Sequence, residues 1–78
     1  MNLADFFGQA VRRHRELLRL SQEELAARAN IDRTYISGVE RGVRNPTLEV
    51  MQRIARALGS DLDVIFSTAR EIGAKVDS

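Results

Sequence analysis

Three arginines with polar neighbours stand out in one stretch of the sequence, DRTYISGVERGVRNPTL. Arg33, Arg41 and Arg44 carry the charge, whereas the helical part of the stretch offers only Ile36 and Val39 as large aliphatic anchors. A guanidinium group is a planar fork of hydrogen-bond donors, which suits paired contacts to phosphate or to the edge of guanine. A helix that only filled a core would not need so many cations on one side. The pattern therefore indicates an outward face that binds an anionic partner.

Two short predicted helices position these side chains. The first follows Ser21, an N-cap with Glu24 three residues later to complete a capping box, and it ends near Ala29. Asn30 suits a left-handed turn, and Asp32 caps the second helix. Two such helices joined by about three residues form a helix-turn-helix, in which the first turn of the second helix reaches base edges. We expect this motif over about residues 21–42.

A first helix is expected over about residues 4–18. Its inward stripe recurs at three- and four-residue spacing: Phe7, Val11, His14 and Leu18. Because the chain has one histidine and no cysteine, we expect His14 to be half-buried and structural rather than a metal ligand.

Two more helices are expected after the motif. One is capped by Thr47 and ends at Gly59, and the next begins at Ser60 or Asp61 and continues to Ile72, with the terminal AKVDS frayed. The predicted fold class is therefore all-α, with one small domain over residues 1–78.

Composition and charge narrow the class further. The net charge is +1, but residues 1–56 hold ten Lys and Arg against seven acids, whereas residues 57–78 hold two against four. No apolar run approaches the roughly 20 residues that span a bilayer, and the start MNLADFFGQAVRR does not read as a signal peptide. We therefore expect a cytoplasmic protein with no membrane partner. No nucleophile, base and orienter occur together, so we expect no enzyme, cofactor or metal.

The segment SQEELAARANIDRTYISGVERGVRNPTLEVMQRIARALG resembles the helix-turn-helix domain of the Cro and phage-repressor class. Within that class, DRTYISGVERGVRNPTL is similar to the controller proteins of restriction–modification systems, which are small dimeric regulators. The resemblance covers roughly residues 7–67 and implies a five-helix, lambda-repressor-like DNA-binding domain that dimerises through its C-terminal helices.

Matched positions imply roles in binding double-stranded DNA. The residue after the Ser21 cap would contact phosphate, the first turn of the helix capped by Asp32 would read bases, and the loop after that helix would add contacts. The residues are Gln22, Arg33, Thr34, Tyr35, Ser37, Arg44 and Asn45. Arg15 and Glu40 match a buried ion pair between the first and third helices. The plainer interpretation is a solvated polar face, but a complete helix-turn-helix favours DNA contact.

The last two predicted helices carry more aliphatic surface than one small core hides. We therefore expect a homodimer on near-palindromic operators, with a dimerisation region over about residues 47–72. The expected interface residues are Val50, Met51, Ile54, Leu58, Leu62, Ile65 and Phe66.

The resemblance implies a regulator that activates its own promoter at low concentration, represses it at high concentration and delays a restriction endonuclease. Glu23, Glu24 and Glu49 are capping and dipole residues, with contact to RNA polymerase as a second interpretation. Two other functions stay open: the DNA-binding antitoxin of a toxin–antitoxin pair, and a helical protein-interaction module that does not bind DNA. An adjacent toxin gene would indicate the first, and failure to shift any duplex at low salt would indicate the second.

Overall fold

A computed structural model describes residues 2–77 of the protein, and this part of the chain is all-α as predicted. It contains five helices and no strand: α1 (Leu3–Leu17), α2 (Gln22–Ala29), α3 (Arg33–Glu40), α4 (Leu48–Ala57) and α5 (Leu62–Asp77). Consecutive helices pack together at α2 with α3 and at α4 with α5, whereas α1 packs mainly against α5 and α3.

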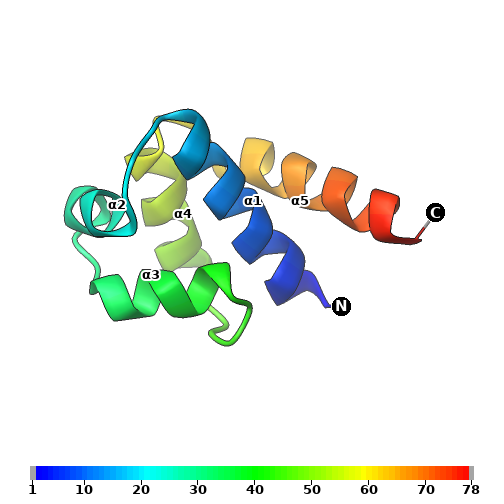
Figure 1. Ribbon diagram of the computed structural model, residues 1–78, viewed down its shortest axis with the longest axis horizontal. Helices are drawn as coiled ribbons and strands as arrows, with labels where there is room; N and C mark the ends of the chain where they lie inside the picture. Colours follow the sequence, from blue (N-terminus) through cyan, green and yellow to red (C-terminus); the bar gives the residue numbers. More distant parts are fainter. Residues whose placement is uncertain (1, 78) are drawn as a thin grey trace.

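The helices form two groups that share one core. α1 and α5 lie side by side and make the most extensive contact between any two helices, while α2, α3 and α4 gather around the other side of α1 (Figure 1). The end of α5 projects beyond α2, α3 and α4, and the principal extents of the molecule are 36 × 22 × 21 Å (Figure 1). The helix-turn-helix formed by α2 and α3 therefore lies at one end of the molecule and the end of α5 at the other.

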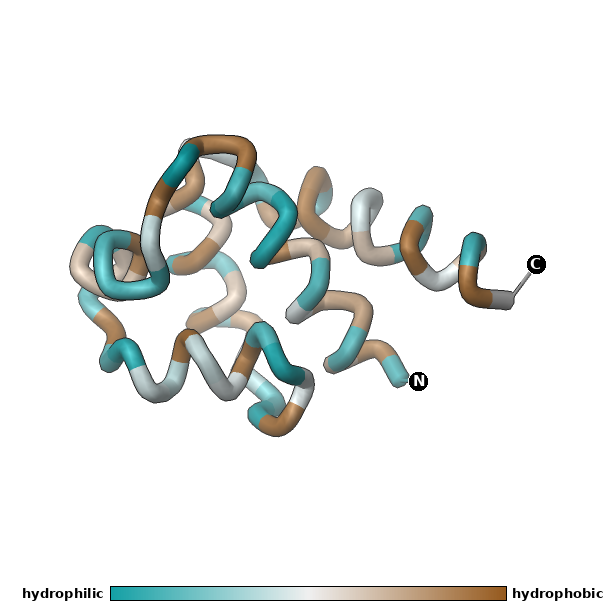
Figure 2. The backbone as a smooth tube through the Cα atoms, viewed as in Figure 1, coloured by the Kyte–Doolittle hydropathy of each residue, from teal (hydrophilic) through white to brown (hydrophobic). Residues whose placement is uncertain are grey.

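The core takes at least one fully buried large side chain from every helix. Hydrophobic and hydrophilic residues alternate in short blocks along each helix, which is the pattern of helices that bury one side (Figure 2). The large side chains with less than 2% exposure are Phe7, Val11, Leu25, Ile36, Val39, Ile54 and Ile65. Because α2, α3 and α4 each bury their anchors in this one cluster, the polar side of α3 is fixed relative to the rest of the fold.

The predicted caps around the helix-turn-helix are confirmed. Ser21 accepts a hydrogen bond from the backbone N–H of Glu24, and the Glu24 carboxylate accepts one from the Ser21 N–H. Asn30 adopts the left-handed conformation with φ of 55°, and the Asp32 carboxylate accepts from the Thr34 N–H at 2.8 Å. Thr47 caps α4 through the N–H of Val50. These local bonds define where α2, α3 and α4 begin.

The end of α1 differs from the prediction. The helix ends at Leu17, and Leu18 is 49% exposed, so its place on the inward stripe was wrong. Arg19 adopts a left-handed φ of 57°, which reverses the chain direction and brings Leu20 into the core instead, at 7% exposure. Arg19 thus occupies a turn position that glycine adopts more easily.

The C-terminal helix also differs from the prediction, because α5 continues through Asp77 rather than fraying after Ile72. Ile72 is buried, and α5 packs along α1, which supports its last turns. His14 is half-buried as predicted, and its Nε2 lies 2.9 Å from Oγ1 of Thr68 on α5. The part of the frayed segment that falls on residue 78 lies outside the described residues.

Three of the residues expected at a dimer interface lie inside the monomer. Ile54 and Ile65 are fully buried, and Leu58 is 4% exposed. The prediction was wrong for these three because they pack into the core of their own chain and cannot contact a partner. Val50, Met51, Leu62 and Phe66 remain partly accessible at the edge of the core.

Within the described residues, no helix is both long enough and apolar enough to cross a membrane. Over residues 2–77, no three His, Cys, Asp or Glu side chains come together in a way that could hold a metal ion.

Candidate nucleic-acid interface

The helix α3 has one side in the core and the opposite side in solvent. Ile36 and Val39 are fully buried, whereas Arg33 and Thr34 in its first turn are exposed. Alternation at three- and four-residue spacing is the reason, since the buried positions fall on one side of the helix axis. The structure therefore presents the first turn of α3 outward, as expected for a recognition helix.

Four of the predicted DNA-binding residues come together where the beginning of α2 faces α3. Gln22, Arg33, Thr34 and Ser37 line one shallow polar depression. Three of them come from one side of α3, and Gln22 is the first residue of α2. The N-terminus of a helix points unpaired backbone N–H groups outward and favours anions. The depression thus combines hydrogen-bond donors with the guanidinium group of Arg33.

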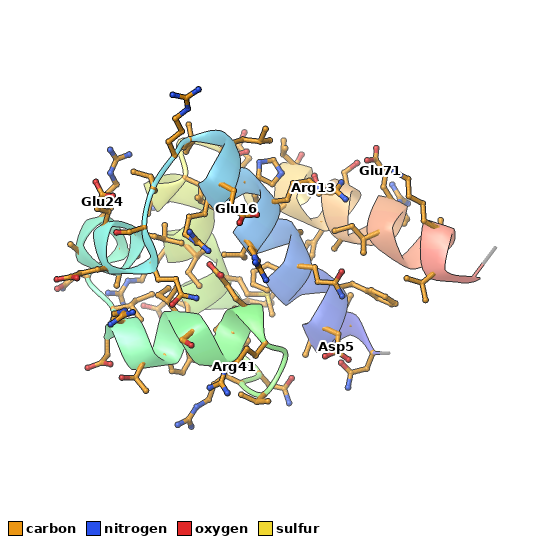
Figure 3. All side chains as sticks on the ribbon, in the orientation of Figure 1. Asp5, Arg13, Glu16, Glu24, Arg41 and Glu71 are labelled. Carbon is orange, nitrogen blue, oxygen red and sulfur yellow. The ribbon has the colours of Figure 1, made fainter. Side chains whose placement is uncertain are left out.

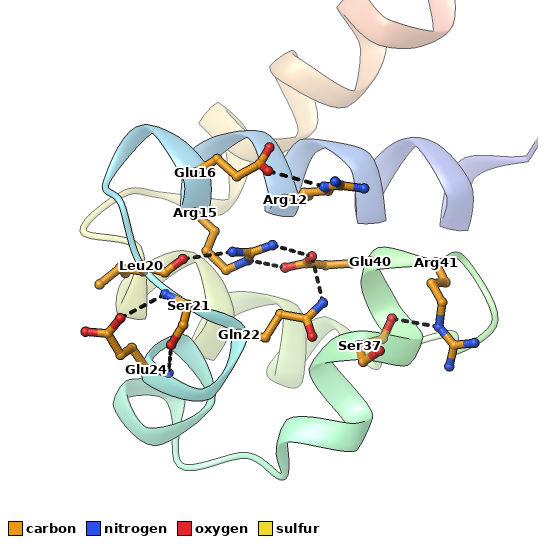
Figure 4. A network of polar contacts seen from close by, with 10 residues as sticks. All are labelled: Arg12, Arg15, Glu16, Leu20, Ser21, Gln22, Glu24, Ser37, Glu40 and Arg41. Carbon is orange, nitrogen blue, oxygen red and sulfur yellow. Dashed lines mark hydrogen bonds and ion pairs between the residues drawn. The ribbon is translucent and has the colours of Figure 1, made fainter.

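A buried ion pair ties α1 to the end of α3, as the family resemblance implied. Arg15 Nε donates to Glu40 Oε2 at 2.7 Å, and Arg15 Nη2 donates to Glu40 Oε1 at 2.9 Å (Figure 4). The two side chains are only 11% and 3% exposed. A third donor, Nη1, bonds the carbonyl of Leu20 at 2.8 Å. The hydrogen bond with Glu40 raises the pKa of the Arg15 guanidinium despite the opposing effect of burial.

The same carboxylate also holds the side chain of Gln22. Gln22 Nε2 donates to Glu40 Oε1 at 3.1 Å, so α1, α2 and α3 meet at one acid (Figure 4). Sequence reasoning missed this link, because nothing in the spacing of residues 22 and 40 reveals it. A side-chain amide has two N–H donors and one carbonyl oxygen, and only one donor is used here. The remaining donor of Gln22 is available to a phosphate oxygen in a fixed orientation.

The other flank of α3 is formed by the loop that follows it. Arg44 and Asn45 are exposed, and the guanidinium carbon of Arg44 lies 5.9 Å from the centroid of the half-buried Tyr35 ring. Arg41 projects away from the body of the molecule, and its Nε donates to the carbonyl of Ser37 at 3.4 Å (Figure 3). Arg41 forms no ion pair with an acid within residues 2–77. Exposed arginines therefore lie at both ends of α3: Arg33 in its first turn, and Arg41 and Arg44 after its last residue.

A further arginine, on α4, bonds the end of α2. Arg53 Nη2 on α4 donates to the carbonyls of Ala29 at 2.9 Å and Asn30 at 2.6 Å. These carbonyls end α2, where helices leave acceptors unpaired. Sequence reasoning missed this contact, since an arginine between apolar positions of α4 reads as ordinary helix surface.

These features define the protein class: two short helices at a fixed angle, a buried anchor side and an outward cationic side. Residues 11–65 match the helix-turn-helix family, and the chain belongs to that family.

Within the family, the chain is similar to the control proteins of restriction–modification systems. It is 46% identical to Control protein C.BamHI of Bacillus amyloliquefaciens over 59 residues, which is 74% of this chain and 73% of that protein. The crystal structure of the restriction-modification controller protein C.AhdI from Aeromonas hydrophila shares 40% identity, with a TM-score of 0.78, over 80% of this chain and 94% of that one. The controller protein C.Esp1396I, solved as a tetramer in complex with its natural 35 base-pair operator, shares 32% identity over 91% and 93% of the two chains, with a TM-score of 0.84.

Proposed function

We propose that the protein is a sequence-specific, DNA-binding transcriptional regulator of the restriction–modification controller type. The observation that carries the proposal is the outward first turn of α3 beside Gln22, fixed to the core by Ile36, Val39 and the Arg15–Glu40 pair. Control proteins match most of the chain, and one relative of this kind was solved on its operator. The protein would act in the cytoplasm without a cofactor and without catalysing a reaction.

In this proposal α3 enters the major groove and its first turn reads base edges. Arg33 donates both ends of its guanidinium to the O6 and N7 of one guanine, a contact worth about 1–3 kcal/mol of discrimination. Thr34 and Ser37 supply hydroxyl groups from the same side of the helix. Gln22 donates its free amide N–H to a phosphate near the start of α2, which sets the depth and direction of α3.

Contacts from the loop after α3 complete the footprint. Arg44 and Asn45 are exposed beside the groove-facing side of the helix, and Tyr35 lies next to Arg44. Each cation that neutralises a phosphate makes binding more dependent on salt.

A homodimer follows from the small number of base pairs that one α3 can read. Two such helices on one face of DNA need half-site centres about 34–36 Å apart. We place the dimer contact on the accessible apolar side of α1 and α5 rather than on the buried residues first expected. A depression there is lined mainly by apolar residues: Leu3, Phe6, Phe66, Ala69, Gly73 and Ala74. The polar residues Asp63, Ser67 and Arg70 of α5 also line it. Val50, Met51 and Leu62 would lie at the periphery of this contact.

Regulation would depend on protein concentration, because dimerisation and successive filling of operator sites change with it. A regulator of this type activates its own promoter at low level, through contact with RNA polymerase, and represses it at high level. Similarity to control proteins favours this function over an antitoxin or an interaction module without DNA.

The direct test is binding to a duplex selected from a random pool, compared with a scrambled duplex of equal length. We expect tight, salt-dependent binding to the selected duplex and weak binding to the scrambled one. Arg56→Ala removes an exposed arginine at the far end of α4 and serves as the charge-matched control for variants in α3. Equal binding to both duplexes, or none at low salt, would refute the proposal.

A further inference from the structure

Gly38 lies on the solvent side of α3 and is nevertheless buried. It follows Thr34 by four residues and Tyr35 by three, so it lies between the exposed Thr34 and the half-buried Tyr35, which packs against the edge of the core. Glycine in the interior of a helix is less favourable than alanine, and the positive φ angles among the glycines occur at Gly42 and Gly59. The backbone conformation of α3 therefore does not require glycine at this position.

The space beside Gly38 is occupied by Arg44. A Cβ atom on Gly38 would lie 2.5 Å from Cγ of Arg44 and 3.6 Å from its Cβ and Cδ. The loop backbone is fixed to the same residue, since the Gly38 carbonyl accepts from the N–H groups of Val43 at 2.9 Å and Arg44 at 3.2 Å. The side chain of Arg44 thus crosses α3 directly over the missing side chain.

The charged end of Arg44 comes to rest one turn nearer the beginning of α3. Its guanidinium carbon is 5.9 Å from the centroid of the Tyr35 ring, which is the range of a cation–π contact. A residue that belongs to the loop in sequence therefore places its charge beside Tyr35 of the recognition helix.

We propose that Gly38 is a positioning residue, whose lack of a side chain seats Arg44 across α3 with its guanidinium against Tyr35. The seat presents Arg44 to DNA as an additional side chain of the recognition helix. This inference rests on the proposed DNA-binding function. Any side chain at residue 38 displaces the stem of Arg44 and releases its guanidinium into the loop.

The DNA test is a double-mutant cycle with Gly38→Ala, Arg44→Ala and the variant that carries both changes. Loss of one charge-assisted contact weakens binding about 10-fold, so we expect Gly38→Ala and Arg44→Ala each to bind the selected duplex about 10-fold more weakly. The combined variant should bind no more weakly than Arg44→Ala alone, because both changes remove the same contact. The Arg56→Ala control should bind like the wild type.

A second readout needs no DNA and so separates this inference from the proposed function. Tyr35 is the single tyrosine of a chain without tryptophan, so intrinsic emission reports on this ring alone. Uncovering the ring should raise its quenching by acrylamide in both Gly38→Ala and Arg44→Ala. The unfolding midpoint of Gly38→Ala should not fall, because alanine is the better helix residue.

Several results would overturn the proposal. One is wild-type DNA binding by Gly38→Ala, and another is a combined loss equal to the product of the two single losses. Unchanged quenching in Arg44→Ala would show that the guanidinium does not cover the ring. Failure of Gly38→Ala to fold would show that residue 38 is needed for α3 itself. It would also reject the proposal that Gly38 serves to position Arg44. Absence of DNA binding by the wild type would reject the proposed function, while the quenching would still test the seat.

Discussion

The Arg15–Glu40 pair offers the sharpest test of how α3 is held in place. Glu40→Gln keeps the shape of the side chain and removes its charge. Arg15 then remains a cation with 11% side-chain exposure and without its hydrogen-bonded ion-pair partner, since only the weaker attraction of Glu16 is left. Breaking a buried pair in this way costs about 3–5 kcal/mol. A domain of 78 residues has a total stability of about 4–12 kcal/mol, so the variant should lose a large part of it.

The molecule contains a matched control in the same helix. Arg12 and Glu16 form an ion pair at 3.5 Å, but their side chains are 63% and 57% exposed. Solvent screening reduces such a pair to about 0.5 kcal/mol or less. We expect Glu16→Gln to unfold almost like the wild type, whereas Glu40→Gln should unfold at a temperature lower by about 12 °C or more.

Urea and thermal unfolding followed by circular dichroism at 222 nm, at one fixed protein concentration, would measure both variants. Arg15→Met combined with Glu40→Leu should recover stability relative to Glu40→Gln, because no unpaired charge remains in the core. The reasoning is wrong if Glu40→Gln costs less than about 1 kcal/mol or no more than Glu16→Gln.

Three further predictions concern charge, backbone and assembly. The hydrogen bonds from Ser21 lower the pKa of Glu24, so the stabilising effect of the Glu24 carboxylate is present above the ordinary pKa of about 4.3 and is lost as the pH falls through its lowered pKa. Glu24→Gln should therefore make the unfolding midpoint less dependent on pH below about 4.3. An unchanged pH dependence in this range would contradict the prediction. Arg19→Gly relieves a left-handed φ of 57° and should raise the free energy of unfolding by about 1 kcal/mol in urea titrations, whereas a loss would show that the arginine side chain matters more. Leu3→Glu places a charge on the apolar side of α1 and α5 and should give monomers in sedimentation velocity, whereas Leu17→Glu, at a residue even more exposed, should leave dimers intact.

Features that depend on nearby residues could be predicted from the sequence. Ser21 and Glu24 bond each other's backbone across three residues, and Asp32 bonds Thr34 across two. Such contacts need no knowledge of the tertiary structure. The Arg15–Glu40 pair was anticipated only through the family resemblance, since a separation of 25 residues gives no local signal.

Competition between equivalent apolar residues could not be resolved from the sequence. Leu17, Leu18 and Leu20 are chemically alike, and the left-handed turn at Arg19 decides that Leu20 enters the core. Ile54 and Ile65 were expected to contact a partner subunit, because periodicity reveals which side of a helix is apolar but not which part of the molecule covers that side. Their burial against the chain's own core is a property of the assembled helices.

The groove-facing surface was only partly predictable for a similar reason. Exposure of Arg33 and Thr34 follows from helical spacing once Ile36 and Val39 are buried. The bond from Gln22 to Glu40 and the contact of Arg44 with Tyr35 join different segments, and only the three-dimensional arrangement reveals them.

The central claim is that the first turn of α3 reads bases, and selection from a random duplex pool tests it most directly. Wild type and Arg33→Ala would be selected in parallel, each with sequencing of the bound fraction. We expect the wild type to enrich a near-palindromic site with half-site centres about 10 base pairs apart. Arg33→Ala should lose enrichment at one guanine per half-site and retain the rest. The same guanine enriched equally by both proteins, or no enrichment by the wild type, would contradict the claim.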